Sequence, residues 1–296
     1  TGTITNNGSG EVTVTATDGR VTFGAITHKG TGNITVRATG SSGDITLNNV
    51  SKTGGTASGL TVRADRDITI SGRTISSTSD KLDVVLNSGA AADGTHGRIT
   101  LSSTTVTSNG GDITLYGGVT AGGDAVYLGT ATGVTLSDTT LNAGGGHIYA
   151  AGRSTTGGGS GGLYLGSATI STTGSGTITL KGTSTAGVNI GYGNGLYLAN
   201  TTISSGTGDI ALTGTTNLSN ANVSSGGYYG AGIRQEGTLS ITSSGGNITL
   251  TGSNTATSYA QEGILFNSDS TAAPAITIAT TGTGSVTLTG TGGSAV

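Results

Sequence analysis

The sequence predicts an all-β protein, a parallel β-helix (β-solenoid) with three strands in each coil. The word GDITL and its close variants recur along the whole chain, helical periodicity is absent, and the words keep their form while their spacing varies. A coil that stacks each strand on its own copy explains the repetition. An antiparallel meander would put unlike strands side by side and would need a tight turn after each.

The recurring word is read as one short strand, best seen at residues 111–115. Successive side chains of a strand point to opposite faces, so Ile113 and Leu115 share the apolar face while Asp112 and Thr114 share the polar one. The leading glycine is expected to allow a positive φ or a tight bend. Near copies of the word begin at Gly43, Gly97, Gly176, Gly208, Gly246 and Gly284.

The composition excludes several other classes of chain. Of 296 residues, 58 are Gly, 1 is Pro, none is Cys, Met or Trp, and 9% are charged. A flexible linker or disordered chain would have few β-branched residues and a high net charge, whereas here Thr, Val and Ile alternate throughout and the net charge is -3. Gly does not fall at every third position, which excludes collagen. A narrow core shared by many stacked strands fits best.

The first part of the chain, residues 1–118, has the shorter and more charged repeats. Nine of the twelve Lys and Arg residues lie between Arg20 and Arg98. Arg37 and Arg63 each follow an apolar strand residue and are expected to point into solvent. Strands are expected from Glu11, Arg20, Asn33, Asp44, Leu60, Asp67, Leu82 and Arg98.

The second part, residues 119–296, has longer repeats of about 31–38 residues, and the whole chain, 1–296, is interpreted as one domain. Each unit has an AVYL-type strand, a second strand of the ATIS type and a third of the TITL type. Stacked coils place Ile178, Ile210, Ile248 and Val286 in one inward ladder and Leu180, Leu212, Leu250 and Leu288 in another. About ten coils would give a rod on the order of 50 Å long.

The order of words over residues 60–118 resembles a known family. RADRDITI, TISST, LDVVLNS, RITLSST and NGGDITL follow one another as in the repeat regions of filamentous-haemagglutinin-like exoproteins of bacterial two-partner secretion. The resemblance implies a right-handed β-helix exported across the outer membrane and used for adhesion or as a fibre. That family's secretion domain carries Asn-Pro motifs, whereas the only Pro here is Pro274, so the resemblance is to the stem without that domain.

No group of residues predicts a catalytic, cofactor or metal site. His28 and His96 are expected in loops and His147 at the start of a strand, without the spacing of metal ligands or of a nucleophile's base. Acidic residues recur where strands begin, and there a carboxylate can accept hydrogen bonds from corner N–H groups. These residues are Asp44, Asp67, Asp112 and Asp209.

The candidate binding face is aromatic. Tyr127, Tyr164 and Tyr197 have the same place in successive strands and are expected to project outward in a ladder, with Arg234 on the next rung. A second set precedes the same strands in a variable loop and consists of Tyr192, Tyr229 and Tyr259. Stacked tyrosines can be purely structural, or their faces can hold sugar rings.

The function expected from these features is a structural stem or fibre segment of a secreted bacterial surface adhesin, not an enzyme. Its expected partners are further coils or other copies end to end and a glycan or receptor, without nucleic acid, membrane insertion or cofactor. The first alternative is a polysaccharide-active β-helix enzyme, which a cleft lined by three or more acids would favour. The second is an ice-binding protein, because such β-helices present flat Thr-x-Thr rows; the word GDITL offers only one outward Thr per strand.

Overall fold

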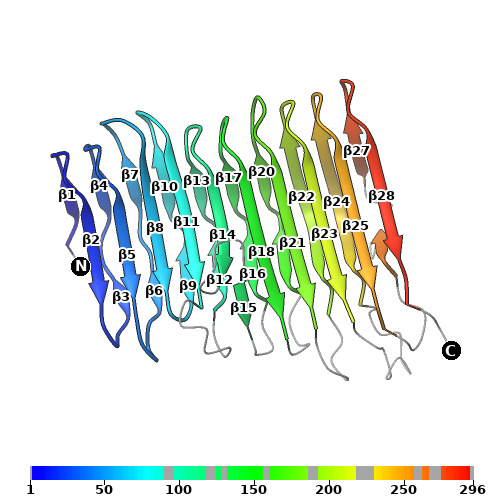
Figure 1. The fold of residues 1–296 in the computed structure, drawn as a ribbon, viewed down its shortest axis with the longest axis horizontal. Coiled ribbons are helices and arrows are strands. Elements are labelled where there is room, and N and C mark those ends of the chain that lie inside the picture. The colour runs from blue at the N-terminus through cyan, green and yellow to red at the C-terminus, as the bar shows by residue number, and fades with distance from the viewer. Residues whose placement is uncertain are drawn as a thin grey trace.

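The computed structural model describes residues 2–89, 97–117, 125–127, 132–155, 161–185, 193–217, 230–256, 262–266 and 275–293. Strands are the only regular elements over these ranges, and they stack into a rod with the two termini at opposite ends (Figure 1). The strand pairs of the described residues are parallel, as in the neighbours β1 (Ile4–Asn6) and β4 (Ile26–His28). The predicted parallel β-helix is therefore confirmed. None of the described segments forms a helix suited to crossing a bilayer.

Two sheets run the length of the rod. Sheet A has 17 strands and sheet B has 11. Besides β1 and β4, sheet A contains β3 (Val21–Thr22), β6 (Ile45–Thr46), β7 (Val50–Lys52), β9 (Ile68–Ser71), β10 (Thr74–Ser77), β12 (Ile99–Ser102), β13 (Thr105–Thr107), β16 (Val134–Ser137), β17 (Thr140–Asn142), β19 (Leu163–Gly166), β20 (Thr169–Ser171), β22 (Leu196–Ser205), β24 (Ile233–Ser243), β26 (Ile264–Phe266) and β27 (Ile276–Thr280). Sheet B contains β2 (Val12–Ala16), β5 (Ile34–Ala38), β8 (Ser58–Ala64), β11 (Leu82–Ser88), β14 (Ile113–Gly117), β15 (Ala125–Tyr127), β18 (Ile148–Ser154), β21 (Ile178–Ser184), β23 (Ile210–Thr216), β25 (Ile248–Asn254) and β28 (Val286–Thr291).

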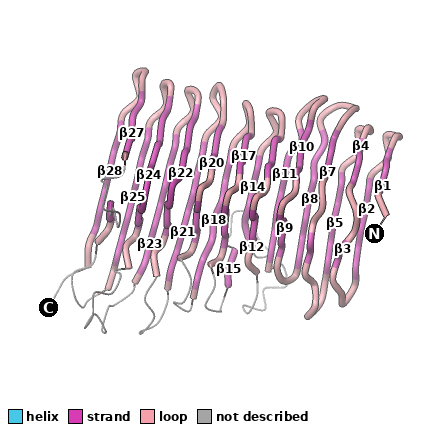
Figure 2. The backbone as a smooth tube through the Cα atoms, turned by 180° about the vertical axis from the view of Figure 1, so that it is seen from behind, coloured by secondary structure: helices cyan, strands magenta, loops and turns pink. Residues whose placement is uncertain are grey.

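One coil passes through sheet A and returns through sheet B. The chain runs along β9 and β10 in sheet A, crosses to β11 in sheet B, and comes back to β12, which pairs with β9 (Figure 2). Further along, β22 alone pairs with both β19 and β20, because the two sheet A strands have merged into one. The corner persists inside β22, where Asn200 has a φ of 50° and the register shifts between Ala199 and Thr201. Coils also lengthen, since Val12 pairs with Ile34 but Ile248 pairs with Val286.

The core is a set of apolar ladders between the two sheets. Ile178, Ile210, Ile248 and Val286 are neighbours in register, as the alternation predicts. Ile178, Ile210 and Ile248 are fully buried, whereas Val286 in the last coil is 40% exposed. The leucine ladder behaves in the same way. The core between the sheets contains a single layer of inward side chains from each sheet. Every coil therefore depends on its neighbours for the burial of these side chains.

The corner between the two sheet A strands has its own chemistry. A residue in the left-handed region turns the chain there, with φ near 50° at Ser103, Asp138, Ser167 and Asn200. The next residue points inward, and Thr139 is 1% exposed and donates its hydroxyl to Leu101 O and Ser137 O. The buried hydroxyl thus satisfies carbonyl groups that the corner would otherwise leave unpaired.

The glycine of the repeated word serves the expected tight bend more often than the expected positive φ. Of the seven word glycines only Gly97 has a positive φ. The N–H of Gly111 donates to Ser108 O, and that of Gly176 donates to Thr173 O, which closes a tight turn in each case. A Cβ on Gly208 would lie 2.0 Å from Gly176 O, so glycine is also required because consecutive coils stack backbone on backbone at this corner.

The carboxylates at the strand beginnings link each coil to the next, as predicted. Asp209 Oδ1 accepts a hydrogen bond of 2.7 Å from Asn247 N, and Asn247 Oδ1 accepts one of 3.0 Å from Ser285 N. Asp112 Oδ1 accepts one of 2.8 Å from His147 N. Asparagine replaces aspartate in this chain of contacts, so the acceptor oxygen matters more than the charge.

Asp209→Ala should lower the free energy of unfolding by about 1 kcal/mol, because Asn247 N loses its acceptor at an exposed position. Asp209→Asn should cost only a few tenths of that, because its amide oxygen can accept the same bond. Urea unfolding followed by circular dichroism measures both changes. Equal losses for the two variants would assign the effect to charge and contradict this interpretation.

Candidate functional site

The aromatic face lies on the outer side of sheet A. Tyr164 of β19 pairs in register with Tyr197 of β22, which pairs with Arg234 of β24. The centroids of the two tyrosine rings are 5.3 Å apart and the ring planes are tilted by 59°. The structure therefore brings these three of the predicted residues together on consecutive rungs. The tilt means that the two rings do not form one flat stacking surface.

Tyr127 does not belong to this ladder. Its partner in register is Ser154 of β18, in sheet B, and the rung below Tyr164 is Thr135 of β16. The expected four-residue ladder was wrong at this position. The signal that could have placed it was the stretch VTLSDTTL, from Val134, which matches LYLGSATI and LYLANTTI over its full length, whereas AVYL matches over four letters.

Arg234 is not an exposed member of the face. Its side chain is 1% exposed, and its guanidinium carbon lies 5.6 Å from the centre of the Tyr197 ring. Its Nη2 donates to Glu236 Oε1, and the Tyr197 hydroxyl donates to Glu236 Oε2. Glu236 was missed by the sequence interpretation, and it joins the ends of both side chains. Tyr197, Arg234 and Glu236 thus form one clamp across β22 and β24.

The clamp keeps both phenols neutral. Burial, then the hydrogen bond to Glu236, raises the pKa of Tyr197 far above its usual value. Burial, followed by the negative charges of Asp138 and Glu236, raises the pKa of Tyr164 as well. A phenol that holds its proton can donate a hydrogen bond but cannot act as a nucleophile at neutral pH. Both phenols therefore remain hydrogen-bond donors at neutral pH.

Tyr197→Phe should reduce the sensitivity of the protein to alkali. A raised folded-state pKa means that the stability contributed by Tyr197 is complete below pH 10 and is lost as the pH rises above it. The variant should lose about 1 kcal/mol of unfolding free energy at pH 8, and the difference from the parent chain should narrow at pH 11. Urea unfolding at both pH values measures this. A constant difference would show that the phenol is not held by Glu236.

The second predicted set, Tyr192, Tyr229 and Tyr259, lies outside the described residues. The structure therefore neither joins these tyrosines to the face of sheet A nor separates them from it.

The histidines show one correction. His28 was expected in a solvated loop, but it lies in β4, is fully buried, and is in register with Asn6 and Lys52. Lys52 is buried too, and its ammonium donates to Gly54 O at 2.6 Å and Ser79 Oγ at 3.2 Å. Burial lowers the pKa of Lys52, against the opposing effect of Asp80. His147 does precede a strand, and His96 lies outside the described residues.

Neither this column nor any other described part of the chain gathers three or more His, Asp or Glu side chains as a metal site would. His28 and Lys52 are better explained as the polar side of the core in the first coils. There the rod is narrow, because its coils are short.

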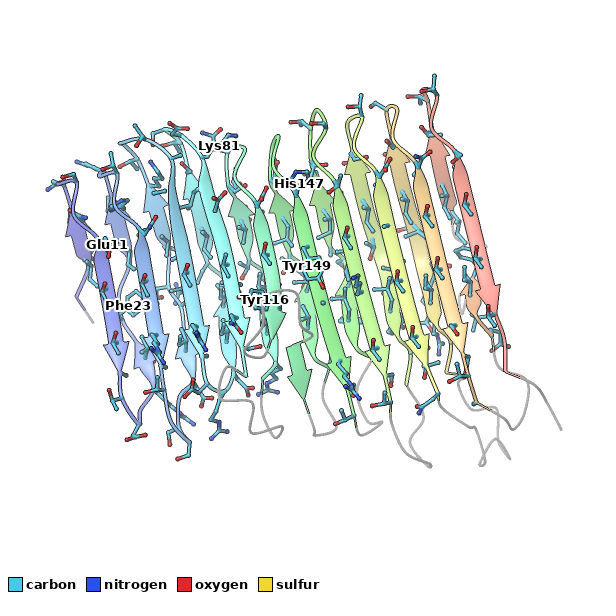
Figure 3. The ribbon with its side chains drawn as sticks, in the orientation of Figure 1. Glu11, Phe23, Lys81, Tyr116, His147 and Tyr149 are labelled. Carbon is cyan, nitrogen blue, oxygen red and sulfur yellow. The ribbon has the colours of Figure 1, made fainter. Side chains whose placement is uncertain are left out.

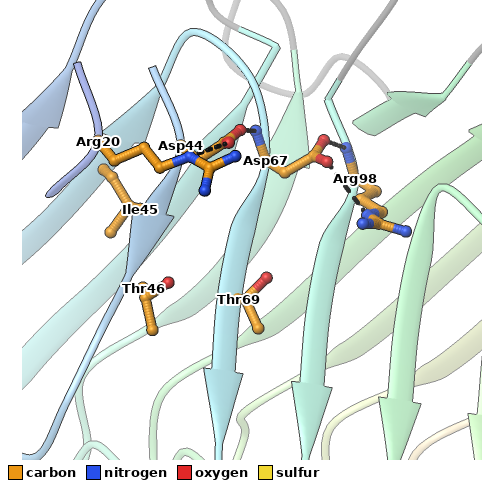
Figure 4. A pocket seen from close by; sticks show the side chains of 7 residues that line it. All are labelled: Arg20, Asp44, Ile45, Thr46, Asp67, Thr69 and Arg98. Carbon is orange, nitrogen blue, oxygen red and sulfur yellow. Dashed lines mark hydrogen bonds and ion pairs between the residues drawn. The ribbon is translucent and has the colours of Figure 1, made fainter. Parts of the chain in front are cut away.

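A polar groove lies on sheet A between Arg20 and Arg98 (Figure 4). Its volume is about 180 Å³, and Thr46 and Thr69 line it. Asp44 pairs with Arg20 at 3.2 Å and with Arg66 at 3.3 Å, while Asp67 pairs with Arg98 at 3.1 Å. Asp67 also accepts hydrogen bonds from the backbone N–H of Gly97 and Arg98.

The groove therefore has two carboxylates, and both are engaged by arginines. A polysaccharide-active enzyme needs carboxylates free to transfer a proton or activate water. The groove supplies an ion-pair ladder across four coils and gives no support to that alternative.

Comparisons with protein-family models, with curated proteins and with solved structures found no match to this chain.

Proposed function

We propose that this chain is a stem or fibre segment of a secreted bacterial surface protein that serves in adhesion or self-assembly. The observation that carries the proposal is the stacking of like coils in register. Ile178, Ile210 and Ile248 form one fully buried ladder, in which each coil covers the core residues of its neighbours. Val286 and Leu288 of the last described coil are 40% and 46% exposed. A further coil of the same kind, supplied by another copy, would continue the ladder by backbone pairing.

The other contacts between consecutive coils are consistent with a continuous rod. Each coil is fixed to the next by parallel backbone pairing and by the side-chain acceptors at the strand beginnings. The same residue types recur at the same positions, so a further coil of this kind would continue every ladder. The family resemblance supports the location at the bacterial surface, which follows from no single residue.

The proposal is tested by imaging the purified chain by negative-stain electron microscopy at increasing concentration. We expect rods of constant width whose lengths are multiples of the single rod. Val286→Lys with Leu288→Lys should reduce the images to single rods, because two charges would stand on the open end. Thr287→Lys, on the outer side of the same strand, is the matched control and should still assemble. Single rods from the parent chain at every concentration would contradict end-to-end assembly.

The adhesive part of the proposal concerns Tyr164. Tyr197 is engaged by Glu236, so a sugar ring would have to use the Tyr164 side of the face. Tyr164→Ser with Tyr197→Ser should abolish binding on a glycan array or to cells while the circular dichroism spectrum is unchanged. Undiminished binding would leave the two tyrosines with a structural role.

A further inference from the structure

The outer face of sheet B carries a second regular surface in the last four strands. The outward positions of β21, β23, β25 and β28 form three columns in register, which we call the hydroxyl array. Nine of its twelve positions are Thr and one is Ser. The columns are Thr179, Ala211, Thr249 and Thr287; Lys181, Thr213, Thr251 and Thr289; and Thr183, Thr215, Ser253 and Thr291.

The sequence interpretation counted one outward threonine in each GDITL word, but the strands continue beyond the word. In β25, for example, Thr249 is followed by Thr251 and Ser253 on the same face. Pairing is continuous without a register shift between β21 and β23, between β23 and β25, and between β25 and β28. The hydroxyls therefore repeat about 4.8 Å across the strands and about 6.6 Å along them.

The hydroxyls of the array are not used by the protein. Among the described residues the hydroxyls of the array's threonines make no hydrogen bond to another protein group, and only the backbone groups of these residues are paired. Buried threonines behave differently: Thr139 and Thr201 each donate to carbonyl oxygens. Threonine in the array therefore serves neither a corner nor the core, and its hydroxyl is available to whatever lies on the surface.

The outer face of sheet A is less uniform than the array. Over the same coils one of its columns contains Ser171, Ser204 and Thr242, and the next contains Thr169, Thr202 and Ser240. In the array the methyl group accompanies the hydroxyl at nine positions, so the surface alternates apolar and hydrogen-bonding points.

Charge and aromatic rings are kept to the margin of the array. Its one charged residue, Lys181, lies on the first strand, with its ammonium 5.5 Å from the ring centre of Tyr149 on β18. Figure 3 labels Tyr149 on this face, which looks toward the viewer. The three strands β23, β25 and β28 carry no charge and no aromatic residue at array positions.

We infer that the hydroxyl array binds ice. A regular lattice of hydroxyl and methyl groups in continuous register suits a ligand that is itself a periodic array of water molecules, whose hydrogen bonds the hydroxyls continue and whose open cages the methyls fill. A crystalline polysaccharide would also be periodic, but sugar rings in proteins stack on aromatic faces, and the array has none. This inference is independent of the proposed stem function.

The test measures inhibition of ice recrystallisation by the whole chain. The parent chain should keep ice grains small at micromolar concentration. Thr251→Lys, at the centre of the array, should raise the concentration required by about tenfold, because one bulky charge prevents close contact of a flat surface. Thr251→Val should have a smaller effect, since it keeps the methyl groups. Ser204→Lys, on the outer face of sheet A, is the matched control and should behave like the parent chain.

Circular dichroism melting of all four proteins checks that each is folded. Absence of any effect of the folded parent chain on ice grains would overturn the inference. Equal loss in Thr251→Lys and Ser204→Lys would overturn the assignment to sheet B. Retention on crystalline cellulose or chitin without retention on ice would replace ice by a polysaccharide and so also overturn it.

Discussion

Ile210→Asp should destabilise the rod by about 4 kcal/mol, because it places an unpaired carboxylate in a core with no polar partner. Ile210 is fully buried and lies between Ile178 and Ile248 in the inward ladder. Because Ile210 is 0% exposed, the charge could reach water only if the coil opened. Circular dichroism melting and urea unfolding should show a lower melting temperature and a lower unfolding free energy.

Ala211→Asp is the matched control, one residue further along the same strand. Ala211 points outward and is partly exposed, so its replacement should change the unfolding free energy by less than about 1 kcal/mol. The two variants have the same charge, the same new side chain and the same strand. Equal melting temperatures would show that the inward and outward faces of β23 have been exchanged.

The apolar ladders could be predicted because they depend on two local rules. Strand alternation decides which side of GDITL is apolar, and the repetition of the word decides that each copy lies on the next. Ile210 and Leu212 are therefore buried as expected. The acceptors at the strand beginnings could be predicted too. Asp209 directly precedes β23 and accepts a hydrogen bond from Asn247 N, which directly precedes the neighbouring strand β25.

The pairing of strands with similar short sequences could not be predicted as reliably. Tyr127 has a local sequence like that of Tyr164, yet Thr135 takes the corresponding rung. The register is set by the whole coil, including the corner residue Asp138 and the buried Thr139, and these follow VTLS rather than AVYL. A four-letter match carried less information than the eight-residue stretch VTLSDTTL, which contains the corner.

The burial of charged residues could not be predicted from strand alternation either. Arg234 is outward by its position in β24, but it is covered and pairs with Glu236 two residues on. Lys52 points inward, and its ammonium donates hydrogen bonds to a carbonyl oxygen and a hydroxyl oxygen. Alternation gives the side of the sheet, whereas burial depends on what other parts of the chain lie against that side.

Gly232→Ala should lower the unfolding free energy by about 3 kcal/mol or more. A Cβ there would lie 2.2 Å from Ser253 N, 2.6 Å from Gly263 O and 2.7 Å from Gly252 C. All three neighbours are backbone atoms, which cannot move aside as a side chain can. Gly232 directly precedes β24 of sheet A and lies against Gly252 near the end of β25 of sheet B. Glycine at both positions lets the coil close.

Gly145→Ala is the control, because a Cβ at Gly145 meets no atom within 4 Å and its φ is not positive. That variant should match the parent chain or be slightly more stable, since alanine has less freedom in the unfolded state. Urea unfolding of both variants, followed by circular dichroism, compares them directly. A Gly232→Ala protein as stable as the Gly145→Ala protein would mean that the two sheets do not approach so closely, and the closure of the coil would need another explanation.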